Sequence, residues 1–188
     1  MTSSWQLKKA IQVINQGGVI CYPTESVYGL GCHPDDLAAV LYLLEIKKRQ
    51  LDKGLLLVAA NVSQLEPYIN INDKQTITKL KEATDKPVTW IVACNEKTPV
   101  WLTGKHQSIA VRISTHPVIN QLCTLFNGAL VSTSANISGL PSVKKNWLVH
   151  KQFGNKIDYY VPGELGRFKK ESEIRNIKTG EVIRTSSI

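Results

Sequence analysis

The sequence predicts an α/β fold, because short apolar runs typical of strands alternate along the chain with segments whose apolar residues recur at helical spacing. The run 55–60 is continuously apolar, which is typical of a strand buried on both faces of a sheet. The chain has 188 residues and 43% of them are hydrophobic, so it is long enough to bury a sizeable core. We therefore expect one domain, or one domain with a small appendage.

The first half of the chain is predicted to fold as helix, strand, helix and strand. Ser and Thr cap candidates precede the first helix, and Gly17 provides its left-handed stop. Pro23 ends the first strand, because its missing N–H cannot continue a central ladder. The polar, glycine-rich segment 24–31 follows as a loop, which is a favourable place for a functional site. The expected elements are a helix at 5–16, a strand at 19–22, a helix from Asp35 or Asp36 to the basic run 47–49, and a strand at 55–60.

The same alternation continues in the second half and becomes less regular beyond residue 140. His116 and Pro117 are interpreted as the start of a helix. The expected elements are helices at 62–70, 74–83, 117–126 and 146–153, and strands at 88–93, 109–113, 129–132, 157–161 and 181–185.

The composition favours an anionic partner and a cytoplasmic location. Lys and Arg number 23 against 15 Asp and Glu, a net charge of +8, although charge alone does not choose between a nucleotide, a nucleic acid and ordinary counter-ions. The longest apolar run is far shorter than the ~20 residues of a membrane-spanning helix, and the amino terminus lacks the core of a signal peptide. We expect no membrane association.

The common signatures of nucleotide, hydrolase and metal sites are missing from the sequence. The pair Gly29 and Gly31 lacks the third glycine of a dinucleotide fingerprint, and neither a GxxxxGK[ST] nor a GxSxG motif occurs. The four cysteines form no CxxC pair and the four histidines form no i, i+4 pair, so no protein-held metal is expected. The cysteines are better interpreted as small buried hydrophobes.

Three groups of polar residues could instead carry chemistry. The segment 132–139, rich in Ser and Asn, could wrap an anion or form an ordinary turn that caps the next element. The basic run 47–49 with Lys53 could serve a site or simply stabilise a helix carboxyl end. Arg112 lies in an otherwise apolar strand, so its guanidinium needs an anionic or carbonyl partner, which could belong to a ligand or be a structural Glu.

Taken together, four motifs in this order resemble the YrdC family, from about residue 7 to residue 185. They are Tyr22-Pro-Thr-Glu-Ser-Val-Tyr-Gly-Leu-Gly31, the KxR of Lys47 to Arg49, Ala110-Val-Arg-Ile113, and Ser132-Thr-Ser-Ala-Asn-Ile-Ser-Gly139. The resemblance implies a twisted open mixed α/β sheet with flanking helices and a concave basic cavity. It also implies a single domain over residues 1–188, without the additional carboxyl-terminal domain of longer relatives.

The activity implied by the resemblance is that of a threonylcarbamoyl-AMP synthase, a nucleotidyltransferase that joins L-threonine, bicarbonate and ATP for the modification of tRNA. Matching by motif gives each residue a role. Lys47 and Arg49 would be catalytic; Thr24, Arg112 and Ser172 would contact threonine; and Lys53, Ser108, Ser132, Ser134, Asn136, Ser142 and Arg184 would bind the nucleotide. Gln50, Lys86 and Glu173 depart from the family pattern, and Glu173 bears on the contacts of Ser172.

The resemblance also implies cofactors and partners. ATP is a substrate, and Mg²⁺ would be held mainly by phosphates and water, because no cluster of carboxylates is available to cage it. The product would pass to a separate tRNA threonylcarbamoyl transferase complex, and direct contact with RNA is a further expectation. The alternative functions are a double-stranded RNA-binding module without catalysis and a non-catalytic nucleotide sensor.

Overall fold

The structure is a computed structural model and describes residues 2–71, 74–82 and 86–185. Its helices are α1 (Ser4–Asn15), α2 (Leu37–Lys47), α3 (Lys74–Lys81), α4 (Val100–Thr103), α5 (Pro117–Phe126) and α6 (Asn146–Phe153), with short 3-10 turns η1 (Leu51–Lys53), η2 (Val62–Leu65) and η3 (Gly154–Lys156). Its strands are β1 (Ile20–Pro23), β2 (Tyr28–Gly31), β3 (Leu56–Ala59), β4 (Val88–Ala93), β5 (Ser108–Ile113), β6 (Leu130–Ser134), β7 (Tyr159–Tyr160), β8 (Glu173–Asn176) and β9 (Val182–Arg184).

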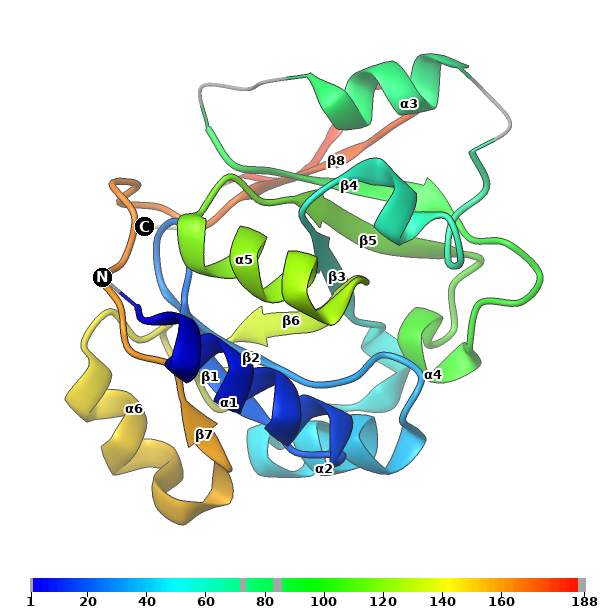
Figure 1. Cartoon of the computed structure of the whole chain (residues 1–188). Helices are drawn as coiled ribbons and strands as arrows, with labels where there is room; N and C mark the ends of the chain where they lie inside the picture. Colours follow the sequence, from blue (N-terminus) through cyan, green and yellow to red (C-terminus); the bar gives the residue numbers. More distant parts are fainter. Residues whose placement is uncertain (1, 72–73, 83–85, 186–188) are drawn as a thin grey trace.

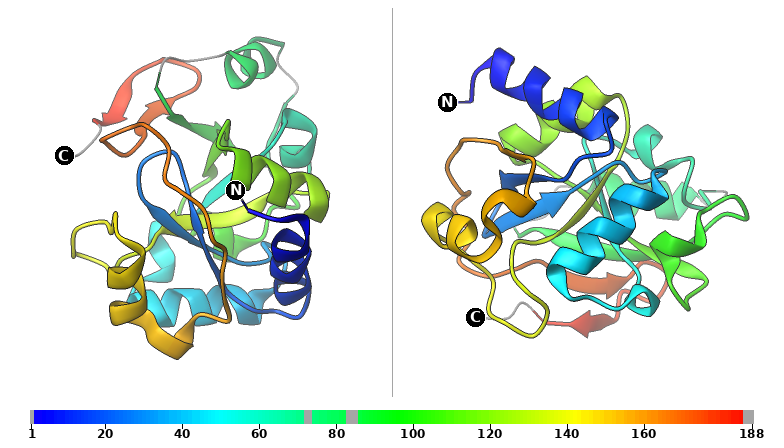
Figure 2. Two further views of the ribbon diagram at one scale, coloured as in Figure 1. Left: turned by 60° about the vertical axis from the view of Figure 1, so that its left-hand side comes forward. Right: turned by 90° about the horizontal axis from the view of Figure 1, so that it is seen from below.

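The strands form one mixed sheet in the order β7-β1-β2-β6-β3-β5-β4-β8-β9. The pairs β1/β7, β3/β5 and β4/β8 are parallel, and the other neighbours are antiparallel. Figures 1 and 2 show the twisted sheet inside the molecule with helices around it. The expected α/β fold with a mixed sheet and flanking helices is confirmed.

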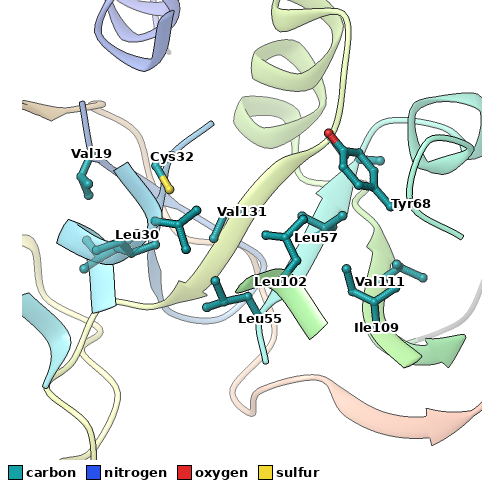
Figure 3. Packing of buried hydrophobic residues seen from close by; sticks show 14 of the residues in the cluster. Val19, Leu30, Cys32, Leu55, Leu57, Tyr68, Leu102, Ile109, Val111 and Val131 are labelled. Carbon is teal, nitrogen blue, oxygen red and sulfur yellow. The ribbon is translucent and has the colours of Figure 1, made fainter. Parts of the chain in front are cut away.

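Side chains on the two faces of the sheet pack into two separate hydrophobic clusters. Leu57 of β3 joins the larger cluster together with residues of α2 and α4, part of which Figure 3 shows. Val58, the next residue, points to the opposite face and joins the smaller cluster beneath α1 and α5. These two helices lie side by side over that face (Figure 1). They leave part of the face uncovered, and that part forms the cavity described below.

Most of the predicted helices and strands are present, with local causes that the sequence indicates. Ser3 caps α1 with a capping box, and Gly17 ends it at a φ of +79°. The side chain of Asp36 caps α2 by accepting from the backbone N–H of Ala39 at 3.0 Å, and Pro117 opens α5. The helix predicted at 74–83 is described to Lys81, and residue 83 lies outside the described residues.

Two predictions of local structure were wrong. The helix expected at 62–70 is only the turn η2, because Pro67 has no N–H to continue a helix. The loop expected at 24–31 ends in strand β2, which pairs with β1 and β6. A Cβ on Gly31 would lie 2.4 Å from the carbonyl oxygen of Val131, so the glycine that suggested a loop is required by a close strand contact. Strand β8 and helix α4 were not predicted.

No helix among the described residues is both long and apolar enough to cross a bilayer. Cys21, Cys32 and Cys123 are buried and Cys94 is half-buried, all as free thiols, which agrees with their interpretation as small apolar residues.

Candidate functional site

A cavity of about 510 Å³ lies on the sheet face that α1 and α5 leave uncovered. Strand β5 explains how the sequence lines it. Ser108, Ala110 and Arg112 alternate toward the cavity, whereas Ile109 and Val111 enter the larger hydrophobic cluster. A second cavity of about 590 Å³ adjoins the first and shares Arg49, Lys53 and Arg184 with it, among others.

Every residue to which the resemblance gave a role lines one of the two cavities. The first holds Thr24, Ser108, Arg112, Ser132 and Ser172; the second holds Lys47, Asn136 and Ser142; and both hold Arg49, Lys53, Ser134 and Arg184. Residues separated by 160 positions in sequence are thus brought together by the sheet. Cationic side chains outnumber acidic ones in both linings, where Glu171 is the acidic residue.

Lys47 ends α2 and is buried, with 2% of its surface exposed. Its Nζ donates hydrogen bonds to the carbonyl oxygens of Ser134 at 2.5 Å and Asn136 at 2.6 Å. Its own carbonyl accepts from the N–H of Ser138 at 2.8 Å. Burial, with a contribution from the nearby Arg49 guanidinium, lowers the pKa of Lys47 to about 7. Lys47 therefore fixes the loop after β6 and can change its charge near neutral pH.

Three charged side chains meet where the two cavities join. Arg49 donates from Nη2 to the carbonyl of Gly54 at 3.0 Å, and its pKa is lowered by burial and by the neighbouring Arg184. The Arg184 guanidinium pairs with the Glu171 carboxylate at 3.3 Å, and the same carboxylate accepts a hydrogen bond from Ser142. A carboxylate is thus held between two residues that were expected to bind phosphates.

Arg112 has the structural anionic partner that the sequence left open. Its Nη2 lies 3.5 Å from Oε2 of Glu25, and both side chains are buried, at 8% and 6% exposure. Ser114 donates to Oε1 of the same carboxylate at 2.5 Å. Among the described residues, Nε of Arg112 has no hydrogen-bond partner. The guanidinium therefore forms an ion pair with Glu25 and also lines the first cavity.

Residues 162–172, here called the strap, run from the end of β7 to the start of β8 (Figure 1, orange). The N–H groups of Gly166 and Phe168 donate to the carbonyls of Thr24 and Glu25, at 2.9 and 3.1 Å. A Cβ on Gly166 would lie 2.6 Å from the Glu25 carbonyl oxygen, so this close approach requires glycine. The strap ends at Ser172, which shares a hydrogen bond of 2.8 Å with Thr89.

The segment 132–139 begins in β6 and continues as the turn that was one of its two expected interpretations. The Asn136 amide donates to the carbonyl of Leu140 at 2.5 Å, as expected of a turn that holds its own shape. Ser132 accepts a hydrogen bond from the buried hydroxyl of Tyr22 at 2.8 Å, which fixes its place on the cavity wall. Binding of an anion by this segment stays a prediction.

Sequence reasoning singled out neither Glu25 nor Glu171. The sequence offered a signal for Glu25. This residue follows Thr24 in the first motif, and Arg112 was expected to need a partner such as a Glu. For Glu171 the sequence offered no comparable signal, since it contacts Ser142 and Arg184 only through the fold.

Among the described residues, no three His, Cys, Asp or Glu side chains are grouped so that they could hold a metal ion. The Glu171 carboxylate is already engaged by Ser142 and Arg184. The donor set of the cavity is hydroxyl, amide, ammonium and guanidinium, which suits anions.

Three kinds of comparison relate this chain to known proteins. The sequence model of the Sua5/YciO/YrdC family, described as "Telomere recombination", matches residues 12–186. A threonylcarbamoyl-AMP synthase of Cellvibrio japonicus is 45% identical over 177 residues, which are 94% of each chain. A protein of the same name from Escherichia coli K12 is 47% identical over 180 residues, 93% of each chain.

Solved structures agree with this similarity. P. abyssi Sua5 complexed with L-threonine matches with a TM-score of 0.90 and 29% identity, over 98% of this chain and 55% of that one. This chain thus spans little more than half of the Sua5 chain. E. coli YciO matches with a TM-score of 0.82 at 21% identity, over 98% of this chain and 90% of that one, which is a likeness of fold.

Proposed function

This chain belongs to the Sua5/YciO/YrdC family, and from this membership and the cavity we infer that it is a threonylcarbamoyl-AMP synthase. It condenses L-threonine, bicarbonate and ATP into threonylcarbamoyl-adenylate, with release of pyrophosphate and water. The observation that carries this inference is that every residue to which the family resemblance assigned a role lines one of two adjoining cavities. The enzyme is a nucleotidyltransferase that serves tRNA modification.

The chemistry requires three anionic reactants to meet. The threonine amine acquires a carboxyl group, and an oxygen of the resulting carbamate attacks the α-phosphorus of ATP while pyrophosphate leaves. The reactants repel one another, so neutralising their charge and placing them in line are the main tasks of the protein. Arg49, Lys53 and Arg184 line both cavities and would neutralise this charge.

The first cavity is proposed to hold threonine. The Arg112 guanidinium would bind the threonine carboxylate, because a planar fork of N–H donors matches a carboxylate. Thr24 and Ser172 would complete the subsite. The Thr24 hydroxyl already donates to the Val27 carbonyl at 2.7 Å, so it offers its lone pairs to the substrate ammonium group.

The second cavity is proposed to hold the nucleotide phosphates. Ser134, Asn136 and Ser142 of the second cavity would bind the phosphates, and Lys53 and Arg184, which line both cavities, would supply charge. Ser108 and Ser132 line the first cavity and would bind the nucleotide where it extends into that cavity. Mg²⁺ would be coordinated mainly by phosphate oxygens and water, and it would neutralise charge on the leaving pyrophosphate. The strap would cover the labile carbamate and exclude water.

Lys47 and Arg49 are proposed as the catalytic pair. Both lie beside the loop that would hold the phosphates, and Lys47 contacts its carbonyls directly. Arg49 lines both cavities, so its guanidinium would stabilise the charge that develops at the phosphorus.

The product is proposed to pass to a separate tRNA threonylcarbamoyl transferase complex, with direct RNA contact as an accessory property. An RNA-binding module without catalysis fits the structure less well. Phosphate-binding cations of such a module are exposed, whereas Lys47 and Arg112 are only 2% and 7% exposed.

Pyrophosphate release from ATP tests the function. Release is expected only when L-threonine and bicarbonate are both present, and Arg49→Ala is expected to lower it about ten- to a hundred-fold. Lys8→Ala, on the exposed face of α1, is the matched control and should leave the rate unchanged. Release that ignores the omission of either substrate would refute the synthase.

A further inference from the structure

Glu25 is a buried carboxylate to which the proposed reaction gives no task. It lies in the turn between β1 and β2, directly after Thr24, with 4% of its surface exposed. Its two oxygens have different neighbours. Oε1 accepts from the Ser114 hydroxyl at 2.5 Å, and Oε2 lies 3.5 Å from Nη2 of Arg112. Its side chain therefore faces the residue that is proposed to bind the substrate carboxylate.

Glu25 is charged at neutral pH. Burial by itself would raise its pKa, but the Arg112 guanidinium and the hydrogen bond from Ser114 hold the pKa below its ordinary value. Burying an ion pair removes two charges from water at a large desolvation cost, and apolar residues of similar size often stabilise a fold equally well. Stability alone is therefore a poor reason for a charged pair at the cavity wall.

Contacts with the strap fix the backbone of Glu25. Its carbonyl accepts from Phe168 of the strap, and Gly166 packs against its backbone. His116 is the other titratable neighbour: its Nε2 lies 3.1 Å from the Glu164 carbonyl, and burial lowers its pKa, so it adds little positive charge. Arg112 is thus the cation that balances Glu25.

We propose that Glu25 is a positioning residue, which holds the Arg112 guanidinium so that its free donors point into the cavity toward the substrate carboxylate. This inference rests on the proposed role of Arg112. A guanidinium has five N–H donors in a plane; Glu25 faces that of Arg112 as an ion pair at Nη2, and Arg112 lines the first cavity. A side chain fixed before binding loses less rotamer entropy when the substrate arrives.

The competing interpretation predicts the opposite sign. If Glu25 merely occupied Arg112 in the empty site, the substrate carboxylate would have to displace it. Neutralising Glu25 would then strengthen the binding of a carboxylate. If Glu25 positions Arg112, the same change weakens that binding.

The test compares L-threonine with L-threoninamide, which lacks the carboxylate, by calorimetry on the full chain. The wild type is expected to bind L-threonine about ten- to a hundred-fold more tightly than the amide. Glu25→Gln keeps the shape and the acceptor for Ser114 and removes the charge, and it is expected to reduce this ratio about tenfold without changing the affinity for ATP. Glu45→Gln makes the same substitution on the exposed face of α2 and should preserve the ratio.

Each outcome decides between the possibilities. If a folded Glu25→Gln variant shows an unchanged or increased ratio of affinities for L-threonine and L-threoninamide, the positioning role is overturned. An increase would show that Glu25 competes with the substrate carboxylate for Arg112. If Arg112→Ala leaves the ratio unchanged, the proposed role of Arg112 fails instead. Should Glu25→Gln not fold, Ser114→Ala removes the hydrogen bond that fixes Oε1, and it must lower the ratio by a smaller factor; no change in this variant would also overturn the proposal.

Discussion

Binding of ATP is expected to be coupled to proton uptake by Lys47. With a pKa of about 7 in the empty site, this amine is only partly protonated at neutral pH. A phosphate oxygen about 4 Å from Nζ would stabilise the ammonium form by about 4 kcal/mol at an effective dielectric constant of about 20. That energy corresponds to about three pKa units, which returns the group to nearly its ordinary pKa. The bound state is therefore almost fully protonated.

The expected uptake depends on pH in a distinctive way. It is about 0.1 proton at pH 6, where the free enzyme is already protonated, about 0.5 at pH 7 and about 0.9 at pH 8. Calorimetric titrations with Mg²⁺ and ATP, in two buffers of different ionisation enthalpy, measure the number directly. In Lys47→Met, the increase of proton uptake between pH 6 and pH 8 should disappear, whereas Lys8→Met on α1 should retain it. Uptake that falls between pH 6 and pH 8, or that is equal in wild type and Lys47→Met, would show that Lys47 does not take up the proton.

Three further variants test other parts of the site and fold. Arg112→Ala is expected to raise KM for L-threonine about ten- to a hundred-fold with little change in KM for ATP, and steady-state kinetics that leave the threonine KM unaltered would contradict it. Gly31→Ala places a Cβ 2.4 Å from the carbonyl oxygen of Val131, so thermal unfolding should show a free energy of unfolding lower by about 1–3 kcal/mol. An unchanged Tm would show that the two strands can move apart to accommodate the Cβ. Glu171→Gln removes the charge that pairs with Arg184 at 3.3 Å, and it is expected to lower KM for ATP about two- to fivefold, whereas a raised KM would mean that the carboxylate assists the nucleotide.

The sequence predicted elements wherever local patterns and tertiary packing agree. Strand β3 is buried on both faces and reads as a continuous apolar run, and α1 carries its cap and its glycine stop in sequence. Strand β8 escaped prediction because it is short, carries Glu173 and Arg175 as an ion pair at 2.6 Å, and exists through its parallel pairing with β4. The departures at Gln50, Lys86 and Glu173 leave the two cavities assembled.

The sequence predicted those residues of the site that belong to recognisable motifs. The motif residues line the cavities as a group, although the sequence could not reveal which polar groups hold them there. Glu25 meets Arg112 across 87 positions, and Glu171 meets Ser142 across 29, so these contacts depend on the arrangement of the sheet and the strap. Identifying the partners of buried charged residues therefore requires a structure.

The two cavities are proposed to join threonine, a one-carbon acid and the adenylyl group of ATP. Incubation with carbon-13 bicarbonate, L-threonine and ATP, followed by mass spectrometry of the nucleotides formed, measures this union directly. An adenylate that contains threonine and carries the label is the expected product. Adenylate without label, or formation of the product at the wild-type rate by Arg49→Ala and Arg112→Ala together, would contradict the claim.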